Sequence, residues 1–389
     1  MININNNVSY VKYETENPLY KRINKMKENH LKGEKNIIYI VPNRYNTSIR
    51  YRSENMIKTI NRLPKLNASL FEMVNINVVL SNLYMVDIII FQRVICYEIR
   101  EYLNQIQKKK IPVLYDIDDF VFSSKCKNYV SNKKVCSYYG KSYEEIIEQV
   151  DMIITSTEYL KLRLSEEFSK KIFKINNYMD DFQYSIAKKI RQNKNVNVKQ
   201  QFIIGYFGGD THFRDLEMVS PMIVSFLEKH KNAKIKIVGM KEIPLAFKQK
   251  DISNQIELIP YMDGYKLMYE YADVNVNIIP LVMDEFSESR SEIKYFEAAS
   301  VGVVSIASPT QVYKKIAEES NSIILSDVNN WSDELEMVYS KKHNMGNMVK
   351  NAIKYVESHY TEETMLPVLN NFVDDVGKNY GKLLYLGNG

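Results

Sequence analysis

Residues 290–308 read RSEIKYFEAASVGVVSIAS, a mixed charged and apolar stretch that ends in a short apolar run. At the 100° per residue of an α-helix, Arg290, Lys294 and Glu297 fall within about 60° of one another, and apolar side chains fill another side. Two cations and a carboxylate on one helical face, beside a strand, could bind a diphosphate and a ribose diol. A solvated face on an ordinary surface helix is the alternative interpretation.

The length and charge of the chain limit its class. A chain of 389 residues predicts two domains, and the net charge of +5 fits phosphate-bearing ligands, an anionic membrane surface or plain solubility. No apolar stretch is long enough to span a bilayer, and residues 1–7 lack the features of a secretion signal, so we expect a cytoplasmic protein. The sequence has no concentrated basic stripe of the kind that nucleic-acid-binding proteins carry, so we expect no nucleic-acid partner.

Strand and helix patterns alternate twice along the chain. Each predicted strand is a short apolar run followed by a helical pattern, which is typical of parallel sheets. The predicted strands of the first array are 36–42, 87–91, 111–115, 152–155 and 171–175. Those of the second array are 202–207, 234–238, 255–260, 274–280, 303–307 and 322–325. The fold class is therefore α/β, with two Rossmann-like, doubly wound parallel-sheet domains and a cleft between them.

The domain boundary is expected near residue 190. Residues 180–201 turn polar and rich in Lys and Asn, which favours a connection between domains. We therefore predict an N-terminal domain over 1–190 and a C-terminal domain over 191–389. A final helix at about 361–387 is expected to pack back on the N-terminal domain.

Two further motifs suggest ligand contacts. Gly208 and Gly209 follow the first strand of the second array and precede a helix, so backbone N–H groups could approach a phosphate. Asp116, Asp118 and Asp119 crowd the end of an apolar strand, as acidic groups do at functional edges. The bland alternatives are a tight turn for the glycines, and a capping carboxylate with a solvated neighbour for the acidic group. Asp116 to Asp118 also matches a metal-binding Asp-x-Asp pattern.

The chain resembles a known family of enzymes. The order of strand, Gly-rich turn and helix, followed by residues 297–308, EAASVGVVSIAS, is similar to retaining GT-B glycosyltransferases of the "group one" family. The resemblance covers residues 202–345 well and residues 37–60, 87–122 and 151–178 more loosely. Within the family, bacterial enzymes of surface-polysaccharide and glycoconjugate assembly are the most similar.

The resemblance implies a donor site in the C-terminal domain. In the family, the glutamate at the position of Glu297 binds the ribose hydroxyls of a nucleotide sugar. The family has another glutamate eight residues earlier, where this chain has Ser289, with Glu288 adjacent. It also has Gly-Arg and then a lysine in the phosphate loop, where this chain has Gly209 and, further on, Arg214.

The other donor and acceptor roles follow from the same resemblance. Arg290 or Lys294 would supply the charge missing from the phosphate loop, and the base would rest near Pro260. Asp118 or Asp119 would orient the transferred sugar or the acceptor hydroxyl, and the Asp-x-Asp metal pattern would be coincidental. The candidate catalytic residues are therefore Asp118, Asp119 and Lys294. The acceptor-side candidates are Arg50, Arg52 and Arg93.

The expected activity is transfer of a sugar from a nucleoside diphosphate donor to a glycan, lipid-linked or protein acceptor, without metal or other cofactor. A lipid-linked acceptor would bring the protein to the inner face of the membrane. Two rivals are a catalytically inactive GT-B homologue that acts as a partner subunit and a sugar-nucleotide epimerase on a similar scaffold. His212, in the phosphate loop, is expected to be a hydrogen-bonding residue rather than a metal ligand.

Overall fold

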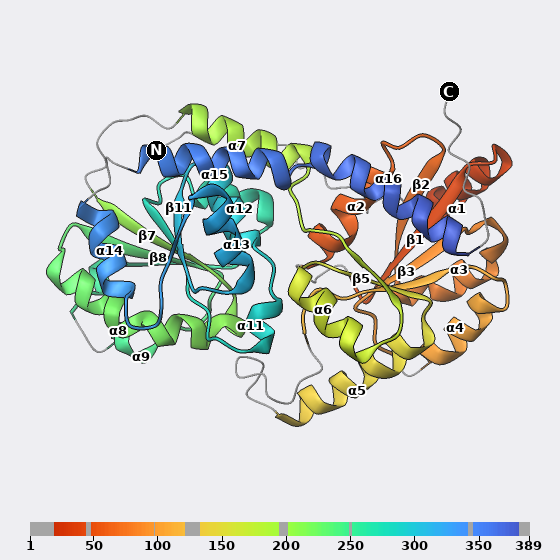
Figure 1. The fold of residues 1–389 in the computed structure, drawn as a ribbon, viewed down its shortest axis with the longest axis horizontal. Coiled ribbons are helices and arrows are strands. Elements are labelled where there is room, and N and C mark those ends of the chain that lie inside the picture. Colours follow the sequence, from red (N-terminus) through yellow and green to blue (C-terminus); the bar gives the residue numbers. More distant parts are fainter. Residues whose placement is uncertain are drawn as a thin grey trace. The chain divides into compact units, whose positions relative to one another are not determined.

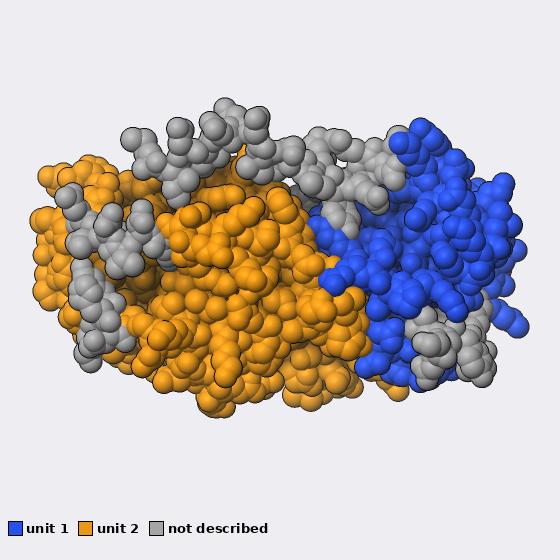
Figure 2. Space-filling view, turned by 90° about the horizontal axis from the view of Figure 1, so that it is seen from above, with its two compact units in different colours: residues 1–116, 370–389 blue, residues 117–369 orange. Residues whose placement is uncertain are grey.

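A computed structural model describes residues 19–43, 48–96, 98–120, 133–193, 201–248, 251–340 and 345–380. Within these ranges the chain forms two parallel six-stranded sheets with flanking helices (Figure 1). This confirms the predicted α/β class with doubly wound parallel sheets. Compact packing divides the chain into two units, residues 1–116 with 370–389 and residues 117–369 (Figure 2). The domain boundary near residue 190 stays a prediction.

The first sheet has the strand order β2-β1-β3-β4-β5-β6. Its strands are β1 (Lys35–Val41), β2 (Leu66–Glu72), β3 (Ile88–Gln92), β4 (Val113–Asp116), β5 (Met152–Thr155) and β6 (Lys171–Lys174). The strands β1 to β5 are buried throughout or nearly so, which explains their almost continuous apolar sequences.

The second sheet has the order β12-β11-β10-β7-β8-β9. Its strands are β7 (Phe202–Phe207), β8 (Ala233–Val238), β9 (Ile256–Ile259), β10 (Val276–Ile279), β11 (Val304–Ala307) and β12 (Ile323–Leu325). The chain runs outward from β7 to β9 and then returns to β10 on the other side of β7. The carboxyl ends of β7 and β10 therefore flank the point where the strand order reverses, which is where open α/β sheets bind ligands.

The helices of the first unit connect its strands. They are α1 (Leu19–Leu31), a π-helix (Arg50–Glu54), α2 (Asn55–Ile60), α3 (Ile76–Ser81) and α4 (Ile99–Gln107). The π-helix runs directly into α2. The apolar residues 78–80 lie in helix α3.

The second unit is richer in helix. Its complete helices are α5 (Lys133–Gln149), α6 (Glu158–Glu167), α7 (Asp181–Asn193), α8 (Phe213–Lys229), α9 (Leu245–Lys248), α10 (Gly264–Glu270), α11 (Glu285–Ser289), α12 (Ile293–Ser300), α13 (Gln311–Ser320), α14 (Trp331–Ser340) and α15 (Gly346–His359). Helix α16 (Glu362–Asn379) begins in this unit, and the other unit includes its residues from Asn370 onward. Among the described helices, none is long and apolar enough to cross a membrane.

Side chains alternate between the two faces of the central strand β7. Phe202, Ile204 and Tyr206 pack with residues of α8 and α14, whereas Ile203 and Phe207 pack with residues of α7, α10 and α12. This period of two is what a strand buried on both faces produces. It fixes which side chains stand near the carboxyl end of β7, where Tyr206 and Phe207 face opposite layers.

The stretch 180–201, which is predicted to connect the domains, contains helix α7 among its described residues. Ile186, Ala187 and Ile190 are buried in the cluster that also holds α10 and α12. The lysines and arginine that made the stretch look polar occupy the other side of an amphipathic helix. Spacing of apolar residues is therefore a better guide here than composition.

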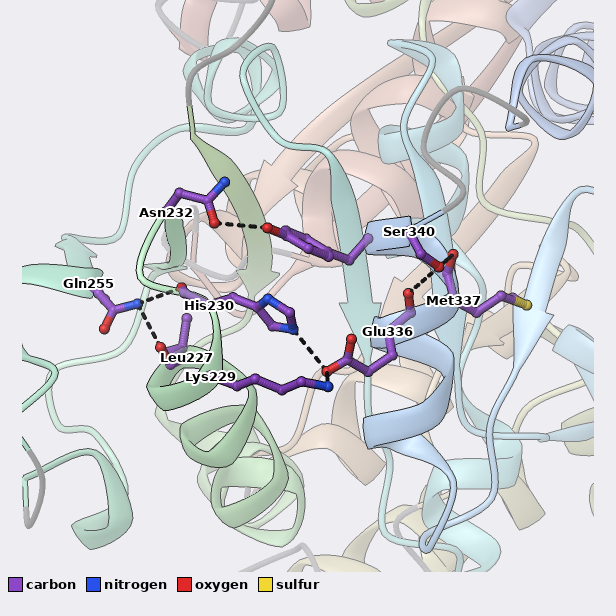
Figure 3. Close-up of polar contacts among 9 residues, drawn as sticks. Leu227, Lys229, His230, Asn232, Gln255, Glu336, Met337 and Ser340 are labelled. Atoms are coloured by element: carbon purple, nitrogen blue, oxygen red, sulfur yellow. Dashed lines mark hydrogen bonds and ion pairs between the residues drawn. The ribbon is translucent and has the colours of Figure 1, made fainter.

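A polar cluster joins the end of α8 to α14 (Figure 3). Glu336 on α14 lies 2.7 Å from Nζ of Lys229 and 2.8 Å from Nε2 of His230. In the same cluster, the Tyr339 hydroxyl donates to Oδ1 of Asn232 at 2.9 Å. Hydrogen bonding to Lys229 is the main cause that lowers the pKa of the Glu336 carboxyl, and His230 adds to it.

We predict that Glu336→Gln lowers the free energy of unfolding by up to about 1 kcal/mol at pH 7, as expected for a partly exposed ion pair. A carboxyl whose pKa is lower in the folded state stabilises above its unfolded pKa and loses that contribution as the pH falls through the folded value. The difference between the two proteins in urea unfolding should therefore disappear below about pH 4. Glu334→Gln on the same helix is the control and should not destabilise at pH 7, since burial raises the pKa of that carboxyl. An undiminished difference at pH 3.5 would contradict the prediction.

Candidate functional site

The turn after β7 brings three backbone segments close together. The N–H of Gly208 donates to the carbonyl of Val238, and Gly239 has a φ of +98°. A Cβ on Gly239 would lie 3.1 Å from the Gly208 carbonyl oxygen, and one on Gly208 would lie 3.3 Å from Nζ of Lys294. Glycine is therefore required at Gly239 by conformation and favoured at Gly208 by the neighbouring amine. The sequence singled out Gly208 and Gly209 but gave no role to Gly239.

Lys294 lies in the first turn of α12 and points its amine at this turn. Its Nζ is buried and has no hydrogen-bond partner among the described residues, and it lies 5.5 Å from the ring centroid of Tyr206. Burial, followed by the charge of Arg290, lowers the pKa of Lys294 to about 7, although Asp215 and Glu297 act in the opposite direction. A buried amine without a partner is uncommon, and an anion beside it would satisfy it.

Arg290 does not belong to the helix that carries Lys294. Helix α11 ends at Ser289, and Arg290 has extended dihedral angles, φ −73° and ψ 143°. The expectation that Arg290, Lys294 and Glu297 share a helical face is therefore wrong for Arg290. Its guanidinium carbon lies 5.0 Å from the ring centroid of Phe286, and no carboxylate in the described part of the chain forms an ion pair with it. Its charge nevertheless acts on Lys294, so the two cations are neighbours.

His212 and Asp215 form a buried pair at the start of α8. Nδ1 of His212 lies 2.8 Å from Oδ2 of Asp215, and Oδ1 of Asp215 accepts from the backbone N–H of Val282 at 2.8 Å. Burial, then the charges of Arg290 and Lys294, lower the pKa of His212 well below its usual value. Sequence reasoning missed Asp215, although its spacing three residues after His212 at a helix start could have indicated the pair.

Glu297 is buried one turn after Lys294 on the same helix. Its Oε1 lies 3.4 Å from Nε2 of Gln183, which comes from α7, and its Oε2 lies 3.3 Å from the hydroxyl of Tyr271. The Tyr271 ring stacks on Phe207 at 3.7 Å between centroids. Gln183 and Tyr271 were not among the predicted site residues, because they come from helices far away in the sequence.

The three aspartates after β4 have different surroundings. Asp116 and Arg52 form a fully buried two-point ion pair, with 3.0 Å for each of the Nε–Oδ1 and Nη2–Oδ2 contacts. The charge of Asp116 is thus balanced within the first unit. Asp118 and Asp119 lie half-buried in the second unit, and Asp119 raises the pKa of His212 against the larger opposing effects. Asp119, rather than Asp116, therefore faces the cationic group around His212.

The remaining predicted residues are more scattered. In the first unit, the Arg50 guanidinium lies 5.8 Å from the Tyr51 ring centroid, and the N–H of Arg93 donates to the Asp116 carbonyl. In the second unit, Arg214 is exposed in the first turn of α8, and Pro260 is exposed directly after β9. The ligand roles of these residues stay predictions.

Ser289 and Glu288 make hydrogen bonds that hold neighbouring segments of the second unit together. Ser289 is fully buried, its Oγ accepts from the N–H of Phe120, and its carbonyl accepts from the Thr157 hydroxyl. Glu288 accepts from the N–H of Gln311 at the start of α13. A larger acidic side chain at position 289 would break the contacts that this serine makes. No group of three or more potential metal-ligating side chains occurs in the part of the chain that the structure describes.

Comparisons with solved structures identify proteins of the same fold. Sucrose-phosphate synthase (tll1590) from Thermosynechococcus elongatus is 11% identical, with a TM-score of 0.65 over 89% of this chain and 100% of that one. A glycosyltransferase from Rickettsia africae is 13% identical, with a TM-score of 0.64 over 89% and 99%. HepE from Anabaena in complex with UDP-glucose is 11% identical, with a TM-score of 0.62 over 87% and 99%. No family model and no curated protein sequence matches this chain. At these identities the comparisons show a shared GT-B fold.

We predict that Lys294→Met raises the stability of the ligand-free protein. The pKa of Lys294 is about 7 in the folded state and about 10.4 in an unfolded chain, so the unfolded chain binds more protons between these values. Wild-type stability should therefore rise with pH from 7 to 10, because the buried charge destabilises fully only below pH 7. One pKa unit corresponds to about 1.4 kcal/mol, so the variant should gain roughly 2–4 kcal/mol at pH 6 and little at pH 10.

The measurement is urea unfolding at pH 6, 8 and 10. Lys315→Met is the matched control, because Lys315 is exposed and its Nζ lies 3.8 Å from Oε1 of Glu319. Its effect should be small and should not follow the same pH dependence. Lower stability of Lys294→Met at pH 6 would show that the amine has a stabilising partner in the free protein.

Proposed function

We propose that this protein is a glycosyltransferase that takes its sugar from a nucleoside diphosphate donor. The observation that carries the proposal is the buried Nζ of Lys294, which has no described hydrogen-bond partner and faces the Gly208 turn. A diphosphate placed there would satisfy that amine, and the carboxyl ends of β7 and β10 are where such a fold binds nucleotides. The shared fold with HepE, whose structure holds UDP-glucose, supports this choice of ligand class.

The diphosphate would be held from two sides. The turn at Gly208 and Gly209, through the backbone N–H of Gly209, and the N-terminus of α8 would contact one side, with Arg214 near the rim. Lys294 and Arg290 would contact the other side. These charges would stabilise the leaving diphosphate as the bond to the sugar breaks, so the proposed reaction uses no metal ion.

The nucleoside would extend from the diphosphate along α12. A carboxylate has about four lone-pair sites, so Glu297 can accept from two ribose hydroxyls in addition to its contacts with Gln183 and Tyr271. The base would rest near Pro260, which directly follows the edge strand β9. This arrangement places ribose and diphosphate binding one helical turn apart on a single rigid element.

The transfer step would retain the configuration at the anomeric carbon, as the resemblance implies. The acceptor oxygen bonds to that carbon, the bond to the diphosphate breaks, and the acceptor proton passes to the leaving phosphate. Asp118 or Asp119 would orient the sugar or the acceptor hydroxyl. The acceptor would be a glycan, a lipid-linked glycan or a protein in surface-polysaccharide or glycoconjugate assembly, and a lipid-linked acceptor would place the cytoplasmic protein against a membrane.

We predict that one of UDP, GDP, dTDP and ADP binds with a micromolar dissociation constant in calorimetric titration, and that the binding survives EDTA. Glu297→Ala should abolish or weaken binding at least tenfold, because the ribose hydroxyls lose their acceptor. Lys294→Met should do the same through the diphosphate.

The control for these titrations is Glu288→Gln, which changes a carboxylate engaged with α13 rather than with the proposed site. It should bind the same nucleotide with unchanged affinity. Binding of none of the four nucleotides would overturn the transferase proposal and favour an inactive partner subunit. Binding that EDTA abolishes would instead support a metal ion at the acidic cluster.

We predict that Asp118→Asn and Asp119→Asn leave nucleotide affinity within about threefold but slow turnover of the bound sugar nucleotide by about 10- to 100-fold, as expected for groups that position the reacting sugar. The measurement is release of the nucleoside diphosphate from its sugar conjugate. Asp263→Asn is the control, because Asp263 caps α10 and asparagine caps helices equally well. Unchanged turnover in both variants would remove the aspartates from the reacting centre.

A further inference from the structure

His212 lies next to the proposed donor site but has no role in it so far. It is the residue directly before α8, a helix of 17 residues. The Tyr206 hydroxyl donates a hydrogen bond to the backbone carbonyl of His212. The same Tyr206 ring lies beside Nζ of Lys294. His212 therefore stands at the meeting point of the glycine turn, the helix N-terminus and the unpartnered amine.

The hydrogen bonds of His212 fix its ring. Asp215 occupies the Nδ1 side, and the N–H of Val282 holds the other oxygen of that carboxylate in place. An ionised Asp215 can only accept, so Nδ1 carries the proton in the neutral ring and Nε2 presents a lone pair. No described residue makes a hydrogen bond to Nε2. The pair therefore leaves one ring nitrogen available to a ligand.

Burial and the charges around His212 keep its ring neutral in the free protein. Burial is the largest cause that lowers the pKa of His212; Arg290 at the end of α11 and Lys294 on α12 lower it further, and Asp119 raises it. The same Arg290 and the same burial act on Lys294, where Asp215 and Glu297 oppose them. Tyr206 on β7 completes the surroundings, and burial raises its pKa, so it is uncharged. The positive charges of His212, Lys294 and Arg290 would repel one another if all three side chains were protonated at once.

We propose that Nε2 of His212 is a third contact of the diphosphate, and that binding of the diphosphate is coupled to uptake of protons by His212 and Lys294. This inference rests on the proposed donor site and adds a residue and a proton requirement to it. The arriving phosphates bring negative charge that removes the repulsion between the basic groups. Solvent supplies the protons, and the protonated groups then donate to phosphate oxygens through Nε2 and Nζ.

The coupling has a direction that can be measured. Groups that gain protons on binding make the affinity fall as the pH rises above their free pKa values, by up to tenfold per pH unit for each proton taken up. Lys294, with a pKa of about 7, is mostly uncharged at pH 8 in the free protein. We therefore expect the affinity to fall about tenfold or more between pH 7 and pH 8.5.

The experiment is calorimetric titration at pH 8 in buffers of different ionisation enthalpy, which gives the number of protons taken up per ligand bound. The ligands are UDP, GDP, dTDP, ADP and inorganic pyrophosphate. The wild-type protein should take up between one and two protons on binding. His212→Asn keeps a donor for Asp215 at the place of Nδ1 but has no Nε2, so the uptake should fall by up to one proton and the affinity about tenfold.

His230→Asn is the matched control, because His230 follows the last residue of α8 as His212 precedes its first, and it contacts Glu336 instead (Figure 3). It should leave both the affinity and the proton uptake unchanged. Thermal unfolding of each variant checks that it is folded, and the wild-type proton count needs no variant.

The outcomes separate this inference from the function on which it rests. A nucleotide that binds without proton uptake, and equally well to His212→Asn, overturns the inference and leaves the proposed function standing. Pyrophosphate that binds with proton uptake while no nucleotide binds supports the proton-coupled site and overturns the donor assignment. No binding by any of the five ligands overturns both.

Discussion

The candidate site depends on the buried amine of Lys294, which has no hydrogen-bond partner among the described residues. Nζ of Lys294 lies beside Gly208 and 5.5 Å from the centroid of the Tyr206 ring. A side chain on Gly208 would touch the amine, and one on Gly239 would push the turn away. Leaving a buried amine without a hydrogen-bond partner costs free energy of folding. The anion proposed to bind there would offset that cost.

Two other buried cations of this chain, Arg52 and Lys236, are paired with carboxylates. Arg52 is bound at two points by Asp116. Lys236 contacts Asp273 at 2.6 Å, and although burial lowers it, hydrogen bonding to that carboxylate leaves the pKa of Lys236 raised. Lys294 has no such partner, and its pKa moves in the opposite direction. The same residue type in two buried positions thus behaves differently because one has a carboxylate within hydrogen-bond distance. This contrast favours a ligand role for Lys294 over an accident of packing.

The sequence predicted every strand of the two described sheets except β2, because buried parallel strands leave a simple apolar signal. It also identified Gly208 and Lys294, since glycine turns after strands and helix-borne cations are local features. Sequence reasoning failed where the structure depends on contacts between segments that are distant in the sequence. Arg290 seemed to continue a helix, and the contact of Gln183 with Glu297 joins α7 to α12 across more than a hundred residues. Such contacts follow from packing angles and loop paths, which no local pattern encodes.

The departures from the pattern of the family that the chain resembles can be explained together under the proposed function. The loop after β7 lacks one arginine, but it contains His212, whose ring Asp215 holds in a fixed tautomer. An arginine is charged at every physiological pH, whereas a histidine next to Lys294 can remain neutral until an anion arrives. A permanently charged loop would add to the repulsion between Lys294 and Arg290 in the empty site. Under the proposed function, a titratable group in place of a fixed charge would lower the cost of the empty site and would make diphosphate binding depend on proton supply.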